Sequence, residues 1–308
     1  ETIVACLMRA AEKAGVKLKV RSPIVSAEKT ENGFALLLRS VLSVRCDRLL
    51  LATGSSPTGH RIATALGHTL EAPVPSLFTF NVSDKRLHQL SGVAVNPVVA
   101  RLKLPGVSGK KNGKHKLQEL DQMGPLLITH WGLSGPAVLK LSAWGARLLH
   151  EQKYTGEVWV NWLPALSQDE IRVQLQQMKR EKGKKAISTY SPYEPISKRL
   201  WQYLLLRSEI VPELTWANLS KKQLNRLVQE LSQGVYIITG KGVFKDEFVT
   251  CGGVKLKEVD FKTMESRRCE GLYLSGEILN IDGVTGGFNF QSAWTTGWLA
   301  GQAMSRLA

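Results

Sequence analysis

The residues with the clearest chemical potential lie near the end of the chain, in the stretch 271–301. A β-prone run at 272–274 leads to Gly276 and Glu277, and a Gly-Gly pair at 286–287 opens a helix pattern of small and aromatic residues. Glycine lacks a Cβ atom and reaches positive φ, so the backbone can approach a ligand closely. The unpaired N–H groups of a helix N-terminus suit a phosphate or an electron-rich carbonyl. The spacing favours a cofactor cradle, with a glycine-rich hairpin before a core helix as the alternative.

Two acidic side chains in this stretch are candidate ligand contacts. Glu277 directly follows a strand and a glycine, where nucleotide-binding folds use an acid to accept hydrogen bonds from sugar hydroxyls. Asp282 precedes Gly283, close to the expected helix start. A loop or helix cap is the alternative for Glu277, and a plain Asp-Gly turn is the alternative for Asp282.

Candidate catalytic residues are weaker. His130 and its neighbour Thr129 interrupt an apolar β run in the motif THWGLSGP. A histidine in such a run is more often structural than a base, because catalysis needs a positioned partner. Ser134 in the same motif lacks the GxSxG spacing of a nucleophile elbow, so we do not expect a hydrolase. Cys251 lies in a glycine-pair turn without a second thiol nearby, and we assign it to packing.

The elements that must position these residues follow an α/β pattern. Residues 49–52 are a continuous apolar run, typical of a parallel strand buried on both faces, and the run ends at Thr53 and Gly54, where such strands meet ligands. Short strands and turns follow, then a helical segment that begins at the N-cap-like Ser167. The pattern predicts four segments: a nucleotide-binding part over 1–72, an inserted β-rich domain over 73–163, an inserted helical subdomain over 164–234, and a return to the first domain over 235–308.

Composition excludes several classes of protein. The 308 residues are 43% hydrophobic and 22% charged, which is ordinary for a globular protein. No apolar run reaches the length of about 18 residues expected of a membrane span, so we expect no membrane partner. Four cysteines without metal-ligand spacing indicate reduced thiols, no metal site and a cytoplasmic location.

A net charge of +15 allows two interpretations. Basic residues cluster at 101–116 and 179–185, but neither run interleaves aromatic residues as a base-stacking platform does. We therefore favour a solvated basic surface over a nucleic-acid site and expect a small-molecule substrate. A non-catalytic flavin- or nucleic-acid-binding module with a basic surface is the alternative function. The pattern indicates no oligomeric state.

Several blocks of this sequence resemble the signature blocks of one family, the YhiN/BaiN-type flavoproteins, and occur in the family's order. The blocks are 51–54 (LATG), 129–136 (THWGLSGP), 250–254 (TCGGV), 263–266 (TMES) and 276–291 (GEILNIDGVTGGFNFQ). The turn at 55–59 (SSPTG) is most similar to the cyanobacterial and chloroplast branch.

The resemblance implies an FAD-dependent oxidoreductase, from a family that includes enzymes described as aminoacetone oxidases and bile-acid-pathway reductases. A hydride would pass between a small-molecule substrate or NAD(P)H and an acceptor. The implied fold is a partial two-dinucleotide-binding, Rossmann-like FAD domain with an inserted β-rich and helical domain. Members normally begin with a strand, a GxGxxG turn and a helix, and we expect such a segment ahead of this chain.

The resemblance also implies the cofactor contacts. Gly54 would lie near the FAD diphosphate or adenosine, the backbone of Ile24 would contact adenine, and Thr53 and Gly253 belong to matched blocks. The residues implied along the ribityl chain and isoalloxazine ring are Gly276, Glu277, Asp282, Gly283, Gly286, Gly287, Phe288 and Asn289.

Overall fold

The computed structural model describes residues 2–40, 43–104, 108–111, 114–117, 120–242, 249–284 and 286–306. The chain divides into two compact units, which interleave along the sequence. Unit 1 consists of Glu1–Glu71, Val254–Leu279 and Trp294–Ala308, and unit 2 consists of Ala72–Gly253 and Asn280–Ala293.

Unit 1 has two small sheets. The first is an antiparallel meander in the order β1-β2-β3, and the second has the order β15-β16-β17-β4. β4 and β17 pair in parallel, from Leu49 opposite Leu272 to Leu51 opposite Leu274, which confirms the parallel strand expected at 49–52. The strands are β1 (Ile24–Thr30), β2 (Gly33–Leu38), β3 (Ser43–Cys46), β4 (Leu49–Leu51), β15 (Val259–Asp260), β16 (Glu265–Ser266) and β17 (Leu272–Leu274).

Unit 1 contains two α-helices and two short 3-10 helices of its own among the described residues. The helices are α1 (Thr2–Lys13), α2 (Pro57–Ala65), η3 (Leu256–Glu258) and η4 (Gly276–Ile278). The C-terminal helix α9 (Gly286–Arg306) begins in unit 2 and continues into unit 1. Its start confirms the helix expected at the Gly-Gly pair.

Unit 2 is built on a closed six-stranded barrel with the order β10-β11-β6-β13-β12-β7, in which every neighbouring pair is antiparallel. Alternate residues point into the barrel because side chains of a strand alternate between its faces, as at the fully buried Val158 and Val160. The strands are β6 (Phe80–Val82), β7 (Ala94–Lys103), β10 (Leu120–Ile128), β11 (Gly132–Ser134), β12 (Gly156–Asn161) and β13 (Gly234–Lys241).

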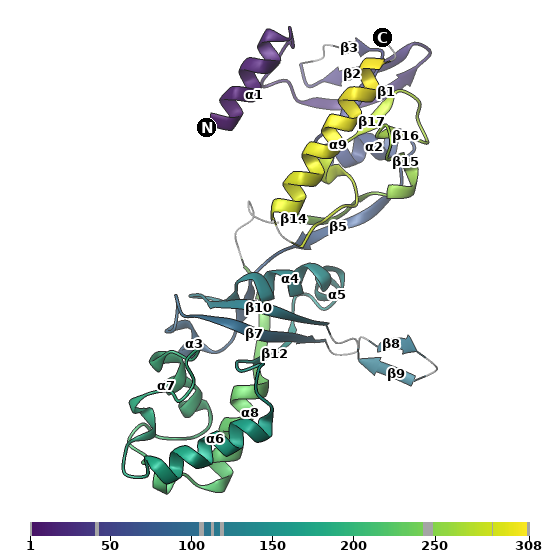
Figure 1. Cartoon of the computed structure of the whole chain (residues 1–308). Helices are drawn as coiled ribbons and strands as arrows, with labels where there is room; N and C mark the ends of the chain where they lie inside the picture. Colours follow the sequence, from purple (N-terminus) through teal and green to yellow (C-terminus); the bar gives the residue numbers. More distant parts are fainter. Residues whose placement is uncertain are drawn as a thin grey trace. The chain divides into compact units, whose positions relative to one another are not determined.

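Helices pack at opposite ends of the barrel, with α4 and α5 at one end and α6, α7 and α8 at the other (Figure 1). Ser167 caps α6 in a capping box with Glu170, as its position in the sequence predicts, and Trp201 stacks on Trp216 inside the helical part. The helices are α3 (Lys85–His88), α4 (Pro136–Trp144), α5 (Ala146–Glu151), α6 (Gln168–Glu181), η1 (Ile187–Thr189), α7 (Lys198–Arg207), η2 (Trp216–Asn218) and α8 (Lys221–Gln233).

Two short two-stranded sheets complete the described elements. β5 (Leu70–Ser76) pairs with β14 (Val249–Val254), and β8 (Ser108–Lys111) pairs with β9 (Lys114–Leu117) within the basic run 101–116. Among the described residues, no helix is both long and apolar enough to cross a membrane.

The structure differs from the sequence analysis in two elements. β13 closes the barrel between β6 and β12, although the sequence analysis puts the boundary of the cofactor domain at 235. An apolar strand does not reveal in its own sequence which sheet it joins. α4 and α5 lie within the segment predicted to be β-rich, because α4 is apolar on most sides and lacks the amphipathic period that identifies a surface helix. The architecture is a mixed α/β fold with a barrel and helices.

Candidate functional site

The turn after β4 has the features of a close-approach loop. Gly54 has φ of +57°, and a Cβ atom there would meet nothing within 4 Å. Gly59, in the first turns of α2, packs so tightly on Thr53 that a Cβ atom would lie 1.8 Å from the threonine Oγ1. Ser56 precedes α2 without a side-chain cap, so the first N–H groups of this helix are available to a ligand. The glycines predicted here are therefore required for backbone geometry and for packing.

A buried histidine lies in the same helix. His60 is 6% exposed, and its Nε2 atom has no hydrogen-bond partner among the residues that the structure describes. Burial lowers the pKa of His60 below its ordinary value, so the ring is neutral at neutral pH. A buried ring nitrogen of this kind can bond to a water molecule or a ligand.

Gly276 and Glu277 follow β17 in the short helix η4. Gly276 has φ of +70°, and its N–H donates to the Thr296 hydroxyl of α9 at 2.9 Å. Glu277 is half-buried, and burial raises the pKa of its carboxyl group. Within the described ranges, no residue hydrogen-bonds to this carboxylate or pairs with it. Its position after a strand and a glycine, with both oxygens unpaired, suits the hydroxyl groups of a sugar or ribityl chain. Ile24, the adenine contact implied by the resemblance, is the first residue of β1.

Asp282 belongs to a polar cluster in unit 2. Its Oδ2 atom accepts a hydrogen bond from the Ser76 hydroxyl at 3.0 Å. Cys251 of β14 contacts both Asp282 and Arg147. Burial raises the pKa of the Cys251 thiol, the Asp282 carboxylate raises it further, and Arg147 opposes the rise. The thiol therefore remains protonated at neutral pH and lies in polar surroundings, whereas the sequence analysis assigns Cys251 to packing.

Asn289 fixes the turn that precedes α9. Its side chain is buried, with Oδ1 accepting from the Gly283 N–H at 2.7 Å and Nδ2 donating to the Gly283 carbonyl at 3.3 Å. A Cβ atom on Gly283 would lie 2.7 Å from the Cβ of Phe288, so the turn requires glycine. The aromatic ring of Phe288 is 63% exposed, and the position of Gly287 is open.

Further glycines predicted for the cofactor occupy defined backbone positions. Gly253 is the buried penultimate residue of β14 and has φ of +127°, and Gly286 is the first residue of α9. The structure brings Asp282, Gly283 and Asn289 together in unit 2, and Gly54, Gly276 and Glu277 lie in unit 1.

The motif THWGLSGP forms a turn and a seam of the barrel. Thr129 accepts hydrogen bonds from the N–H groups of Trp131 and Gly132, and His130 is exposed at the tip of this turn. A Cβ atom on Gly132 would lie 2.2 Å from the Phe80 carbonyl oxygen, because β11 packs directly against β6. The structure thus gives the motif a packing role, and Thr129 and His130 remain candidates without a described catalytic partner.

A serine, a histidine and a glutamate form a chain of hydrogen bonds in unit 1 that the sequence analysis misses. His68 Nδ1 lies 3.0 Å from Glu258 Oε2, and its Nε2 lies 2.8 Å from Ser266 Oγ. The Ser266 oxygen also accepts the N–H groups of Arg268 and Cys269, so its lone pairs are occupied. Burial lowers the pKa of His68 in spite of the neighbouring Glu258. The three side chains are buried, and we interpret the chain as a structural network and not as a hydrolase triad.

Comparison with protein families identifies the barrel and helices of unit 2. The family model described as "HI0933-like protein barrel and H2TH domain" matches residues 74–249, more than half of the chain. The chain belongs to the HI0933-like family. This confirms the resemblance to the YhiN/BaiN-type FAD-dependent oxidoreductases, since HI0933-like is the family name for that group. The matched range includes β13 and the helices that belong to the same unit as the barrel.

Three relatives of this HI0933-like chain have names that state an activity. The ribosomal RNA dihydrouridine synthase of Escherichia coli is 30% identical over 98% of this chain and 71% of its own length. The ribosomal RNA dihydrouridine synthase of Haemophilus influenzae is 31% identical over 99% of this chain and 73% of its own length. The 3-dehydro-bile acid delta(4,6)-reductase of Clostridium scindens is 32% identical over 83% of this chain and 62% of its own length.

Proposed function

We propose that this protein is an FAD-dependent reductase that saturates the ring double bond of uracil in ribosomal RNA. The observation that carries the proposal is the match to two ribosomal RNA dihydrouridine synthases over 98% and 99% of the chain. The matches include both compact units, so the proposal concerns the whole chain and not the barrel alone. NAD(P)H is the proposed electron donor.

The residues of the candidate site fit a flavin dinucleotide. Glu277 offers the hydroxyl groups a carboxylate that no residue of the described ranges pairs with, and Gly54 and Gly276 have positive φ, which favours glycine over a side chain. The uncapped start of α2 and the start of α9 at Gly286 offer backbone N–H groups to the diphosphate and to the flavin pyrimidine edge. FAD, when bound, supplies the hydride that the reaction requires.

The other cofactor contacts follow the family assignment. We propose that the backbone of Ile24 contacts adenine and that Thr53, Gly253, Asp282, Gly283, Gly287, Phe288 and Asn289 complete the cofactor site. Asn289 holds the turn at Gly283 with two hydrogen bonds, so it would position the start of α9. The Rossmann-like architecture of the cofactor domain is part of the same proposal.

Reduction of a double bond conjugated to a carbonyl also needs a proton. We assign the proton donor to the Cys251 thiol, because burial and Asp282 raise its pKa and keep the proton on sulfur at neutral pH. Asp282 belongs to both the cofactor stretch and the thiol cluster, which supports this assignment. Of the candidates named from the sequence, Thr129 donates a hydrogen bond to the Gly132 carbonyl within its own turn, and His130 has an exposed ring.

A second candidate is reduction of a steroid-like small molecule. It is supported by the 32% identity with the 3-dehydro-bile acid delta(4,6)-reductase, and it agrees with the small-molecule substrate expected from the sequence. We favour RNA because the two synthases match nearly the whole chain, whereas the reductase matches 83% of it. A reductase of either substrate, and not a non-catalytic binding module, is the common conclusion.

The test uses the purified protein, its absorbance spectrum and two substrates. We expect flavin absorption bands, NAD(P)H consumption, and a mass increase of two hydrogen atoms per modified uridine in ribosomal RNA from a strain without endogenous activity. Protein without flavin would refute the cofactor assignment. Reduction of an unsaturated steroid without reduction of the RNA would favour the second candidate.

A further inference from the structure

The helical part of unit 2 contains a basic groove between α6 and α8. The two helices pack against each other and leave a cavity of about 480 Å³. Arg172 and Lys179 reach it from α6, and Lys221 reaches it from α8. The remaining lining consists of Gln176, Asn225 and two leucines, without a carboxylate. We call this surface the α6–α8 groove.

Neighbouring carboxylates compensate the positive charges of the α6–α8 groove only weakly. Lys179 donates to the Leu219 carbonyl at 2.6 Å, a contact that orients the ammonium group without neutralising it. Arg172 pairs with Asp169, whose side chain is 88% exposed, so water screens this pair. In the part of the chain that the structure describes, no carboxylate pairs with Lys221. The groove is therefore a site of positive potential.

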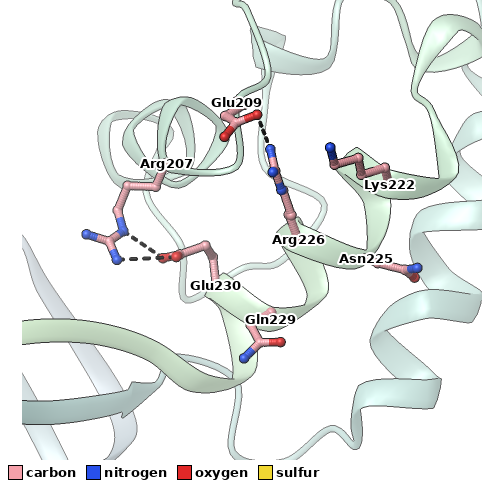
Figure 2. Close-up of a pocket in the computed structure, with 7 residues that line it drawn as sticks. All are labelled: Arg207, Glu209, Lys222, Asn225, Arg226, Gln229 and Glu230. Carbon is pink, nitrogen blue, oxygen red and sulfur yellow. Dashed lines mark hydrogen bonds and ion pairs between the residues drawn. The ribbon is translucent and has the colours of Figure 1, made fainter.

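The positive surface continues around α8. Lys222 and Arg226 lie one helical turn apart on α8 and line a second pocket, and Asn225 points in a different direction from them (Figure 2). Arg226 forms an ion pair with Glu209, which is 70% exposed, and no carboxylate of the described residues pairs with Lys222. The first turn of α8 contains no acidic residue, whereas that of α6 contains Asp169 and Glu170.

We infer that the α6–α8 groove docks the phosphate backbone of the RNA substrate. The inference rests on the proposed function and specifies which surface holds the RNA. Two lysines and an arginine supply charge, and the amides of Gln176 and Asn225 donate hydrogen bonds of the kind that phosphate and sugar oxygens accept. Since no aromatic side chain lines the groove, it contacts the backbone without reading the bases.

The test compares two double variants that each remove two positive charges. The groove variant is Arg172→Gln, Lys221→Gln, in which Lys179 is kept because it bonds to the backbone. The control variant is Lys17→Gln, Lys257→Gln, both exposed residues of unit 1. Fluorescence anisotropy measures binding of a labelled ribosomal RNA transcript between about 50 and 200 mM salt, without NAD(P)H.

We expect the groove variant to bind the RNA more weakly and to reduce the slope of log K against log salt by about 2, near one unit for each lost phosphate contact. The control variant should keep the wild-type slope. Equal slopes for the two variants would overturn the inference. It would also be overturned if the groove variant lost binding to vesicles with anionic lipids and bound RNA as the wild type does, since the surface would then serve a membrane.

The measurements distinguish failure of the RNA-docking inference from failure of the proposed reaction. An altered salt slope without dihydrouridine formation by the wild type would support the groove and refute the proposed reaction. Dihydrouridine formation with an unchanged slope in the groove variant would refute the groove alone. Thermal unfolding checks the fold, since substitutions of surface residues away from buried networks should leave both variants with nearly the wild-type unfolding temperature.

Discussion

Replacement of Arg207 by methionine should destabilise unit 2, because two carboxylates share this guanidinium group. Arg207 donates to Glu230 through Nε at 2.7 Å and Nη2 at 3.2 Å, and to Asp84 through Nη1 at 3.3 Å. Nη2 also donates to the Val235 carbonyl at 2.8 Å, at the start of β13. Arg207 thus joins the last turn of α7 to α8 and the barrel.

The expected loss follows from the burial of the network. The side chains of Arg207, Asp84 and Glu230 are 20%, 20% and 17% exposed. Removing one partner of a fully buried ion pair costs about 3–5 kcal/mol, and partial exposure lowers the expectation here to about 2–4 kcal/mol. Asp84 keeps hydrogen bonds from the Tyr203 hydroxyl and from the N-terminus of α3. Glu230 loses both of its hydrogen bonds to Arg207, so most of the loss should arise there.

The assay is urea unfolding followed by tryptophan fluorescence, with Arg226→Met as the matched control. The partner of Arg226, Glu209, is 70% exposed, so this variant should lose less than about 1 kcal/mol. The double variant Arg207→Met, Glu230→Gln should recover part of the loss, because position 230 then carries no uncompensated charge. Equal losses for the two single variants, or no recovery in the double variant, would refute the reasoning.

The remaining predictions concern the Cys251 thiol, the buried His68 and two glycines. Asp282→Asn should lower the pKa of Cys251 and speed its alkylation by iodoacetamide at neutral pH, because the variant removes a negative charge beside the thiol; an unchanged pH profile of alkylation would contradict this. Because burial lowers the pKa of His68, the unfolded chain takes up the proton more readily, so the free energy of unfolding should fall as pH drops below about 6.5; a His68→Gln variant, less stable overall, should show a weaker dependence, since His60, whose pKa burial also lowers, still contributes. Gly59→Ala should cost about 1–3 kcal/mol because its Cβ would collide with a side chain 1.8 Å away, whereas Gly297→Ala, at an open position in α9, should stabilise the helix by about 0.5–1 kcal/mol; thermal unfolding checks both signs.

Short stretches of the sequence predict those elements of the fold whose formation depends on residues close together in the chain. The apolar run at β4 identifies a buried strand because both faces must be covered, and it does pair in parallel with β17. The start of α6 is predicted by Ser167 because a serine side chain caps the third residue that follows it, and the structure contains that capping box. The glycine pattern before α9 likewise predicts a helix start.

Contacts between segments that are distant in the chain cannot be predicted from this sequence alone. Cys251 meets Asp282 and Arg147 only because β14 and the segment before α9 lie close to α5 in unit 2, and no spacing encodes that meeting. The same holds for His68 and Glu258, which look like isolated residues of a loop and a short helix. Polar networks of this kind depend on tertiary packing, so they become visible only with the structure.

The two glycines of the motif THWGLSGP have a structural role that bears on how the motif is interpreted in other sequences. Gly132 leaves room for a carbonyl of β6, and Gly135, with φ of +91°, lets the chain turn into α4 beside the Pro125 carbonyl oxygen, 2.8 Å from where its Cβ would be. Both requirements belong to the closure of the barrel. A distant sequence that retains these glycines is therefore expected to retain the barrel whatever chemistry it performs, so the two glycines are a marker of architecture.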